Sequence, residues 1–202
     1  MRILLIGALI GLWAPAAHAC EGQKGNVLYD VNRGRTSYQG FVVKATGAEI
    51  SGIQPGHFFN QADYCLEVVF PPNDVPPDDP IAIAYSASVR FLSSADSTEF
   101  YLADLTNSGV VSLYHGSSPA KIVKIWSVDQ KSTANLAKGS SNAIEAIVKG
   151  STISVLLNGK LVKTVRTQIP KGDLRFGFDL EAGRAMPPGD FTIKSIKVTE
   201  AQ

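Results

Sequence analysis

The chain has few of the residues that bind transition metals. Its 202 residues include two cysteines and three histidines, and none of them falls in an H-x-x-x-H or C-x-x-C spacing. A zinc site draws three or four ligands from His, Cys, Asp and Glu. Three acids, Asp74, Asp78 and Asp79, lie close together but lack the spacing of an EF-hand loop. We interpret them as solvated loop residues, with calcium as the alternative, and expect no cofactor and no metal site.

The short motifs of common enzyme classes are also missing. The chain contains no G-x-S-x-G elbow, no P-loop and no G-x-G-x-x-G run, which mark serine hydrolases, NTPases and dinucleotide enzymes. A catalytic triad can still be assembled from residues that are far apart in sequence. The sequence therefore identifies no catalytic residue, and it favours a non-enzymatic function without excluding an enzyme.

An excess of either charge is absent as well. The chain has 19 lysine and arginine residues against 18 aspartate and glutamate residues, which gives a formal net charge of +1. Nucleic-acid binding depends on positive charge that neutralises phosphates. We therefore expect no nucleic acid among the partners.

Long hydrophobic runs are confined to the N-terminus. The chain opens MRILLIGALIGLWAPAAHA, with one arginine, a short apolar run and then small residues. This arrangement is typical of a secretory signal peptide, and the run is too short to span a bilayer. We expect residues 1–19 to be a signal peptide, residues 20–202 to form a single domain without a membrane span, and the protein to be periplasmic or secreted.

Both cysteines, Cys20 and Cys65, belong to the expected mature chain. An even number of cysteines in an exported protein indicates a disulfide, so we expect these two to be bonded. A rival interpretation makes Cys20 a lipid-anchored cysteine, because it would directly follow the cleavage site. The preceding Ala-His-Ala resembles the Leu-Ala-Gly type of lipobox poorly, and lipidation would leave Cys65 without a disulfide partner.

What the chain does contain is a series of short alternating runs. In IAIAYSASVRF, residues 81–91, Tyr85, Ala87 and Val89 share one face and Arg90 lies on the other, which predicts a strand. Similar runs follow, mostly separated by turn residues: EFYLADL, VVSLYH, AKIVKIW, NAIEAIVKG, TISVLL, KLVKTV, DLRFGFDLE and DFTIKSIKV. Many short strands at this spacing favour an all-β sandwich or barrel. The proline-rich stretch 70–80 and the stretch 131–139 are expected to be loops.

One turn is specified closely. Asn158-Gly159 separates two alternating runs, and both residue types tolerate the positive φ of a type I′ hairpin turn. We interpret this turn as a corner of the scaffold rather than as part of a binding site.

The order of these runs carries a resemblance to a known family. The segments AIEAIVKGSTISVLLNGKLVKTV, GDLRFGFDLE and DFTIKSIKVTE, with FYLADLTNSGVVSLYHG upstream, resemble concanavalin A-like lectin/glucanase domains over roughly residues 40–200. Laminin G modules and a bacterial domain class named for 3-keto-disaccharide hydrolases are related in shape. The resemblance implies a jelly-roll β-sandwich of two antiparallel sheets and a carbohydrate-related function, although a fold alone does not establish function.

The acids of the chain do not fit the glucanases of that family. Those enzymes carry a Glu-x-Asp-x-x-Glu strand, because retaining hydrolysis needs two carboxyl groups close together on one face. No such spacing occurs, and Glu99 and Glu145 stand alone on their expected strands. Asp179 and Glu181 do share a strand face; we interpret them as solubilising residues, with acid–base work as the alternative.

Strand alternation also predicts a binding face. The face that points away from the core is expected to carry Arg90, Tyr101, Tyr114 and Trp126, with Tyr114 outward because Leu113 is assigned to the core. Aromatic rings on an open sheet suit stacking on a sugar ring, so we expect these four residues to bind a glycan. In the competing interpretation Trp126 packs under a loop and the tyrosines fill the edges of the core.

Three function classes follow from these observations. The first is an exported carbohydrate-binding or carbohydrate-related domain without glucanase activity. The second is a sugar-active hydrolase or lyase of the 3-keto-glycoside type. The third is a structural or protein-interaction domain of the cell envelope, which would show an apolar patch or an open sheet edge.

Overall fold

A computed structural model of the chain describes residues 19–30, 41–45, 48–50, 61–72, 85–94, 98–118, 121–170, 174–182 and 189–202. These residues form thirteen β-strands and one short 3₁₀ helix, η1 (Ala19–Gly22). Within them no helix has the length and hydropathy needed to cross a membrane. The acids considered for calcium, Asp74, Asp78 and Asp79, lie outside the described residues.

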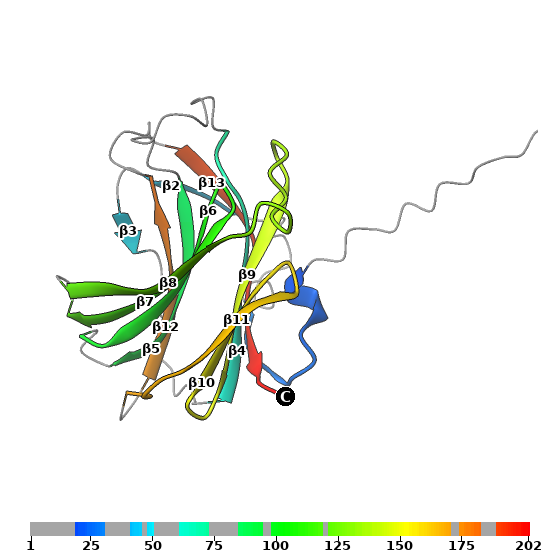
Figure 1. The fold of residues 1–202 in the computed structure, drawn as a ribbon. Coiled ribbons are helices and arrows are strands. Elements are labelled where there is room, and N and C mark those ends of the chain that lie inside the picture. The colour runs from blue at the N-terminus through cyan, green and yellow to red at the C-terminus, as the bar shows by residue number, and fades with distance from the viewer. Residues whose placement is uncertain are drawn as a thin grey trace, which may run out of the picture.

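The strands form two sheets. Sheet A has the order β1 (Val27–Asp30), β13 (Gly189–Glu200), β4 (Gln61–Val69), β9 (Ser141–Lys149), β10 (Thr152–Leu157) and β11 (Lys160–Arg166), and β2 (Phe41–Ala45) also pairs with β13. Sheet B has the order β3 (Ala48–Ile50), β12 (Leu174–Glu181), β5 (Ser86–Ser94), β6 (Phe100–Thr106), β7 (Val110–Ser118) and β8 (Lys121–Asp129). The described strand pairs are antiparallel, and the sheets lie face to face (Figure 1). The predicted all-β jelly-roll β-sandwich is confirmed.

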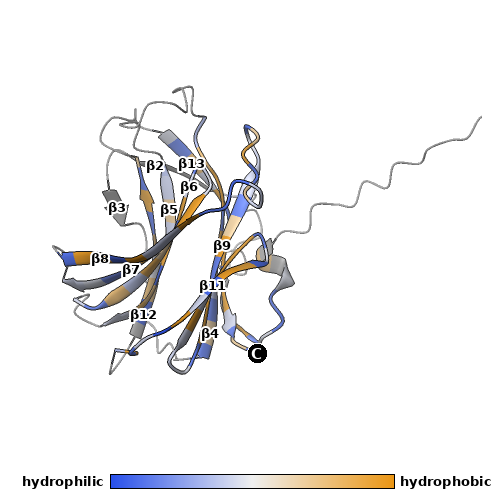
Figure 2. Cartoon of the chain, viewed as in Figure 1, coloured by the Kyte–Doolittle hydropathy of each residue, from blue (hydrophilic) through white to orange (hydrophobic). Residues whose placement is uncertain are grey.

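The core lies between the sheets because every second strand residue points inward. On β10, Ile153, Val155 and Leu157 are fully buried while the residues between them are partly exposed. Hydrophobic and hydrophilic stretches accordingly alternate along the strands in Figure 2. Tyr64 of β4 stacks on Phe91 of β5 with ring centroids 5.7 Å apart, and this pair joins the two sheets.

The turn between β10 and β11 is structural, as interpreted from the sequence. Asn158 and Gly159 have φ angles of 50° and 74°. The Asn158 side chain accepts a hydrogen bond from the Ala143 amide at 2.8 Å and donates one to the Thr133 carbonyl at 2.9 Å. These bonds tie the turn to β9 and to the segment 131–139, which forms turns rather than a helix.

The expected disulfide is present. Cys20 of η1 is bonded to Cys65 of β4, with Cα atoms 5.6 Å apart, and both residues are buried with Ala143 in a small cluster of their own. Lys197 of β13 donates a hydrogen bond from Nζ to the Cys20 carbonyl at 3.2 Å. The N-terminal segment is therefore fastened to the face of sheet A that points away from sheet B.

Candidate functional site

The candidate site is the face of sheet B that points away from the core. Strand register places Asp179, Ser88, Asp104 and Ser112 side by side in one row across β12, β5, β6 and β7. Neighbouring strands are about 4.8 Å apart, so this row brings residues from distant parts of the sequence within reach of one ligand.

This outer face is recessed. Ser88 and Arg90 are only 6% exposed and Asp104 only 7%, although all three point away from the core. Ser88 and Asp104 lie at the floor of a groove of about 350 Å³, which is a small but ordinary size for a ligand site. The groove is lined by Ser86, Ser88, Leu102, Asp104, Thr106, Tyr114, Ile122 and Glu181.

Asp104 is the central polar group of the groove. Ser88 donates a hydrogen bond from Oγ to Asp104 Oδ1 at 2.7 Å. Burial raises the pKa of Asp104 to about 6, and the negative charges of Glu181 and Asp179 act in the same direction. Hydrogen bonds from Ser88 and Ser86 oppose this rise. Near pH 6 the carboxyl group can therefore serve both as a hydrogen-bond donor and as an acceptor.

Arg90 is held in place by its neighbours. Its Nε and Nη2 atoms donate to Asp179 Oδ2 at 3.1 and 2.9 Å, and its guanidinium carbon lies 4.1 Å from the centre of the Phe100 ring. The Phe100 ring in turn covers Gly116, where an added Cβ would lie 2.2 Å from Phe100 Cζ. Arg90 is therefore held beside the groove, next to its cross-strand neighbour Leu102, with its charge already paired; it is not among the residues that line the groove.

The opposite side of the groove is apolar. Leu102 and Tyr114 are cross-strand neighbours on β6 and β7, and Ile122 on the edge strand β8 is 48% exposed. Lys124 Nζ lies 5.8 Å from the centre of the Tyr114 ring. An aromatic ring beside buried hydroxyl and carboxyl groups is the combination that binds amphipathic ligands such as sugars.

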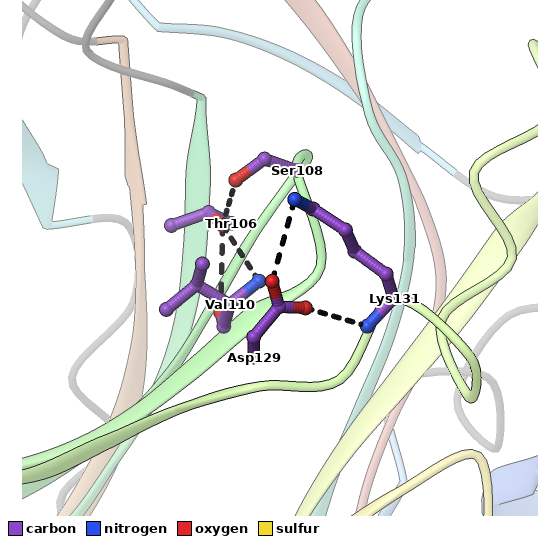
Figure 3. A network of polar contacts seen from close by, with 5 residues as sticks. All are labelled: Thr106, Ser108, Val110, Asp129 and Lys131. Atoms are coloured by element: carbon purple, nitrogen blue, oxygen red, sulfur yellow. Dashed lines mark hydrogen bonds and ion pairs between the residues drawn. The ribbon is translucent and has the colours of Figure 1, made fainter. Parts of the chain in front are cut away.

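One end of the groove is held by the turn between β6 and β7. Thr106 Oγ1 accepts a hydrogen bond from the Val110 amide at 3.1 Å and shares one with Ser108 Oγ at 2.8 Å. Close by, Asp129 at the end of β8 accepts a bond from the Lys131 amide at 3.0 Å and pairs with the Lys131 ammonium at 3.3 Å. Figure 3 shows both groups of contacts; those with Val110 and Ser108 keep Thr106 positioned at the groove.

No family profile matches the chain, and no curated protein matches it by sequence. Solved structures match its fold. Sheep galectin-11, in a complex with glycerol, has a TM-score of 0.53 at 10% identity, over 74% of this chain and 98% of that one. The chain has the concanavalin A-like lectin/glucanase fold.

Two further structures with the concanavalin A-like fold are similar. Carbohydrate-binding module CBM66 from Bacillus subtilis has a TM-score of 0.52 at 11% identity, over 81% of this chain and 84% of that one. The Bacillus licheniformis β-glucanase has a TM-score of 0.50 at 12% identity, over 88% of this chain and 100% of that one. At these identities the likeness shows the fold alone.

On this concanavalin A-like sheet two of the four expected site residues lie where they were predicted. Arg90 and Tyr114 both belong to the outer face of sheet B. The pair Asp179 and Glu181 also shares this face, opposite the buried Phe178.

The predicted outward position of Trp126 is wrong. Its side chain is 8% exposed and belongs to the core. On β7, Leu113 pairs with Trp126 and the next residue, Tyr114, pairs with Lys124. Ile125 of β8 therefore has no partner on β7 and is an extra residue in that strand. Such a bulge reverses the alternation of side chains beyond it. The parity of β8 alone could not reveal this.

The predicted outward position of Tyr101 is also wrong. Its side chain is 3% exposed and stacks on His115 with ring centroids 4.7 Å apart. Its hydroxyl bonds to the Thr167 hydroxyl and donates to the Gln168 carbonyl at 3.0 Å. On β6 the inward set is Tyr101, Ala103 and Leu105, so the more polar face carries Phe100 and Leu102 as well as Asp104.

Asp104 is the main residue that sequence reasoning missed. Its strand EFYLADL has apolar residues on both faces, so alternation did not say which face was buried. The position of Asp104 beside Ser88 follows only from the register of β5 with β6. Among the described residues no group of three or more His, Cys, Asp or Glu side chains is placed to hold a metal ion.

The raised pKa of Asp104 predicts a pH-dependent stability. A carboxyl whose pKa is higher in the folded state than in the unfolded state stabilises the fold below about pH 4, and this contribution is lost as pH rises to about 6. A rise of about two pKa units corresponds to about 3 kcal/mol in the free energy of unfolding. Asp104→Asn retains the oxygen that accepts the hydrogen bond from Ser88. Its free energy of unfolding, measured by urea denaturation from pH 4 to 7, should lack this part of the decline with rising pH. Identical pH profiles for the two proteins would contradict the assignment.

Proposed function

We propose that the protein is an exported glycan-binding module that binds a sugar in the groove of sheet B. The observation that carries this proposal is the composition of the groove, which is lined both by Tyr114 and by the polar residues Asp104 and Ser86. Sugars present apolar ring faces and hydroxyl groups together, and such a ligand suits both sides of this groove.

Each residue has a distinct part in the proposal. Tyr114 stacks on the ring face, Leu102 and Ile122 extend the apolar side, and Asp104 and Glu181 bond to hydroxyl groups. Ser88 positions Asp104 through its 2.7 Å hydrogen bond. One stacked ring contributes about 0.5–1.5 kcal/mol beyond area burial, so we expect binding in the range of about micromolar to millimolar.

Tyr114→Ala tests the proposed site. A glycan array first identifies a ligand, and a calorimetric titration then compares the variant with the wild type. Loss of the stacking ring should weaken binding about tenfold or more, with little change in the unfolding temperature because Tyr114 is partly exposed on the outer face.

Leu161→Ala is the matched control, since Leu161 is 63% exposed on β11 of the other sheet. This control should bind the glycan as the wild type does. Wild-type affinity in Tyr114→Ala would place the binding site elsewhere.

A second candidate is a sugar-active hydrolase or lyase. The observation that favours it is that Asp104, whose pKa burial raises to about 6, lies on the same face as Glu181, and acid–base chemistry needs carboxyl groups within reach of one substrate. Incubation with the bound glycan and with a panel of 3-keto-glycosides, followed by mass spectrometry, separates the two functions. Product formation that Asp104→Asn abolishes would establish the enzyme; unchanged ligand supports the binding module.

Export is part of the proposal. A disulfide persists in oxidising compartments, so the Cys20–Cys65 bond supports a periplasmic or secreted location; cleavage of the leader before Cys20 is proposed from the sequence pattern of residues 1–19. The alternative is a lipid anchor on Cys20, which would replace the disulfide. The intact mass of the exported protein tests both points.

A further inference from the structure

The face of sheet A that points away from sheet B holds a second cavity. It is lined by residues of this face, of the N-terminal segment that the disulfide fastens there and of the C-terminal end of the chain. Figure 1 shows the N-terminal segment and the C-terminus close together on this side of sheet A. We name it the arm cavity; its volume is about 300 Å³. Its polar lining includes Gln23 of the N-terminal segment, Asp63 of β4, and Glu145 of β9, while Ile147 and Leu156 form an apolar wall.

Two buried acceptor atoms of the arm cavity have no hydrogen-bond partner. Asp63 is 8% exposed, and its Oδ1 atom has no hydrogen-bond partner; the same is true of Gln23 Oε1. Gln23 uses its amide nitrogen to bond the Asp63 carbonyl at 3.1 Å, so turning the amide over would place two oxygens together. Buried acceptors without donors are costly, and a ligand with several N–H groups would satisfy them.

The lysines near the arm cavity do not fill this role. Lys197 Nζ donates to the Cys20 carbonyl at 3.2 Å, and it reaches Asp63 only through a longer-range attraction that it shares with Lys149. Lys24 is exposed at the rim. Glu200, also in the lining, accepts a bond from Asn26 at 2.7 Å.

Asp63 and Glu145 behave as a pair that shares a proton. Burial raises the pKa of Glu145 to about 8, and the nearby Asp63 carboxylate adds to the rise. Burial also raises the pKa of Asp63, whereas hydrogen bonds with Glu145 and Gln23 lower it by a smaller amount. A cation that entered the cavity would take over the role of this proton, because it would neutralise the same charge.

We propose that the arm cavity binds the ammonium end of a small primary aliphatic amine. The ammonium group supplies three N–H donors to Asp63, Gln23 and Glu145, and the hydrocarbon chain lies along Ile147 and Leu156. A bare metal ion fits less well, because no set of three metal-ligating side chains occurs among the described residues. The apolar wall also supplies no oxygen ligands for a metal ion. This site is separate from the groove of sheet B.

The probe is 1,5-diaminopentane, titrated calorimetrically into the full mature chain at pH 6, 7 and 8. Binding should tighten as the pH rises, because the ammonium displaces the proton held by Asp63 and Glu145, and protons should be released to the buffer. Neutral 1,5-pentanediol, which has the same chain length, should not bind. Failure of the diamine to bind, or equal binding of the diol, would overturn the proposal.

Glu145→Gln should weaken binding of the diamine at least tenfold and abolish its pH dependence, since the amide keeps the shape but not the charge. Leu156→Trp provides an independent variant that fills the cavity from the apolar wall and should also prevent binding. Glu99→Gln, at an exposed acid directly before β6, should bind as the wild type does; an equal loss there would show a general charge effect and refute the site. Calcium binding that depends on Glu145 in place of diamine binding would also refute it.

Discussion

Replacing Trp126 by alanine is expected to lower the free energy of unfolding by about 3–5 kcal/mol. The side chain is only 8% exposed and packs in the main core from the edge strand β8. Lys163 of β11 lies with Nζ 5.7 Å from the Trp126 ring, so the indole helps to close the side of the sandwich where the two sheet edges meet. Urea denaturation followed by circular dichroism measures the loss.

Val123→Ala is the control on the same strand. Val123 is 53% exposed, so its truncation should change stability by less than about 0.5 kcal/mol. A loss as small as this in Trp126→Ala would mean that the indole is on the surface and that the bulge at Ile125 is absent. A folded Trp126→Phe variant should retain glycan binding, because the ring does not reach the groove.

Removal of the disulfide is expected to have the second large effect. The bond joins residues separated by 45 positions, and closing a loop of this length stabilises the fold by about 4 kcal/mol through the unfolded-chain entropy. The double variant Cys20→Ala/Cys65→Ala should therefore unfold at a lower urea concentration. Changing both cysteines together avoids leaving a reactive thiol in the cluster with Ala143.

The wild type under reducing conditions is the control for this prediction. Its unfolding curve should approach that of the double variant, and glycan binding by the folded fraction of either should be unchanged because the groove lies on the other sheet. A double variant as stable as the oxidised wild type would show that the bond does not constrain the chain.

The two outer faces of the sandwich therefore differ in character. Sheet B leaves a recessed groove with Tyr114 and Asp104 open to a ligand. Sheet A carries the N-terminal segment, fastened by Cys20 and Lys197, over its own outer face. This division assigns the proposed glycan to one face and the proposed amine to the other, and variants in Tyr114 and Glu145 should act independently.

Much of the architecture could be predicted from local pattern. Strict alternation placed Arg90 and Val89 on opposite faces of one strand, and likewise Tyr114 and Leu113. Asn158-Gly159 specified a hairpin turn, and both residues have positive φ. These features depend on neighbours in the chain, because side-chain direction within one strand has a period of two. The pairing of the two cysteines followed from their number and the expected export.

The site required information that no single strand contains. The extra residue Ile125 becomes visible only when β8 is paired with β7, and it moved Trp126 from the expected surface to the core. The row of Asp179, Ser88 and Asp104 depends on the register of three strands, and register is set by tertiary packing rather than by local sequence.

The sequence alone determined that this protein is an all-β chain with a turn at Asn158-Gly159, because alternation and turn chemistry are short-range properties. Alternation left a sandwich and a barrel open, and the cysteine pair was expected from the even cysteine count. The tertiary structure decided which aromatic rings face outward, that Asp104 lies at the floor of a groove, and that Asp63 meets Glu145 under the N-terminal segment. Those outcomes depend on burial and on contacts between distant strands, and the raised pKa values of Asp104 and Glu145 follow from the same burial.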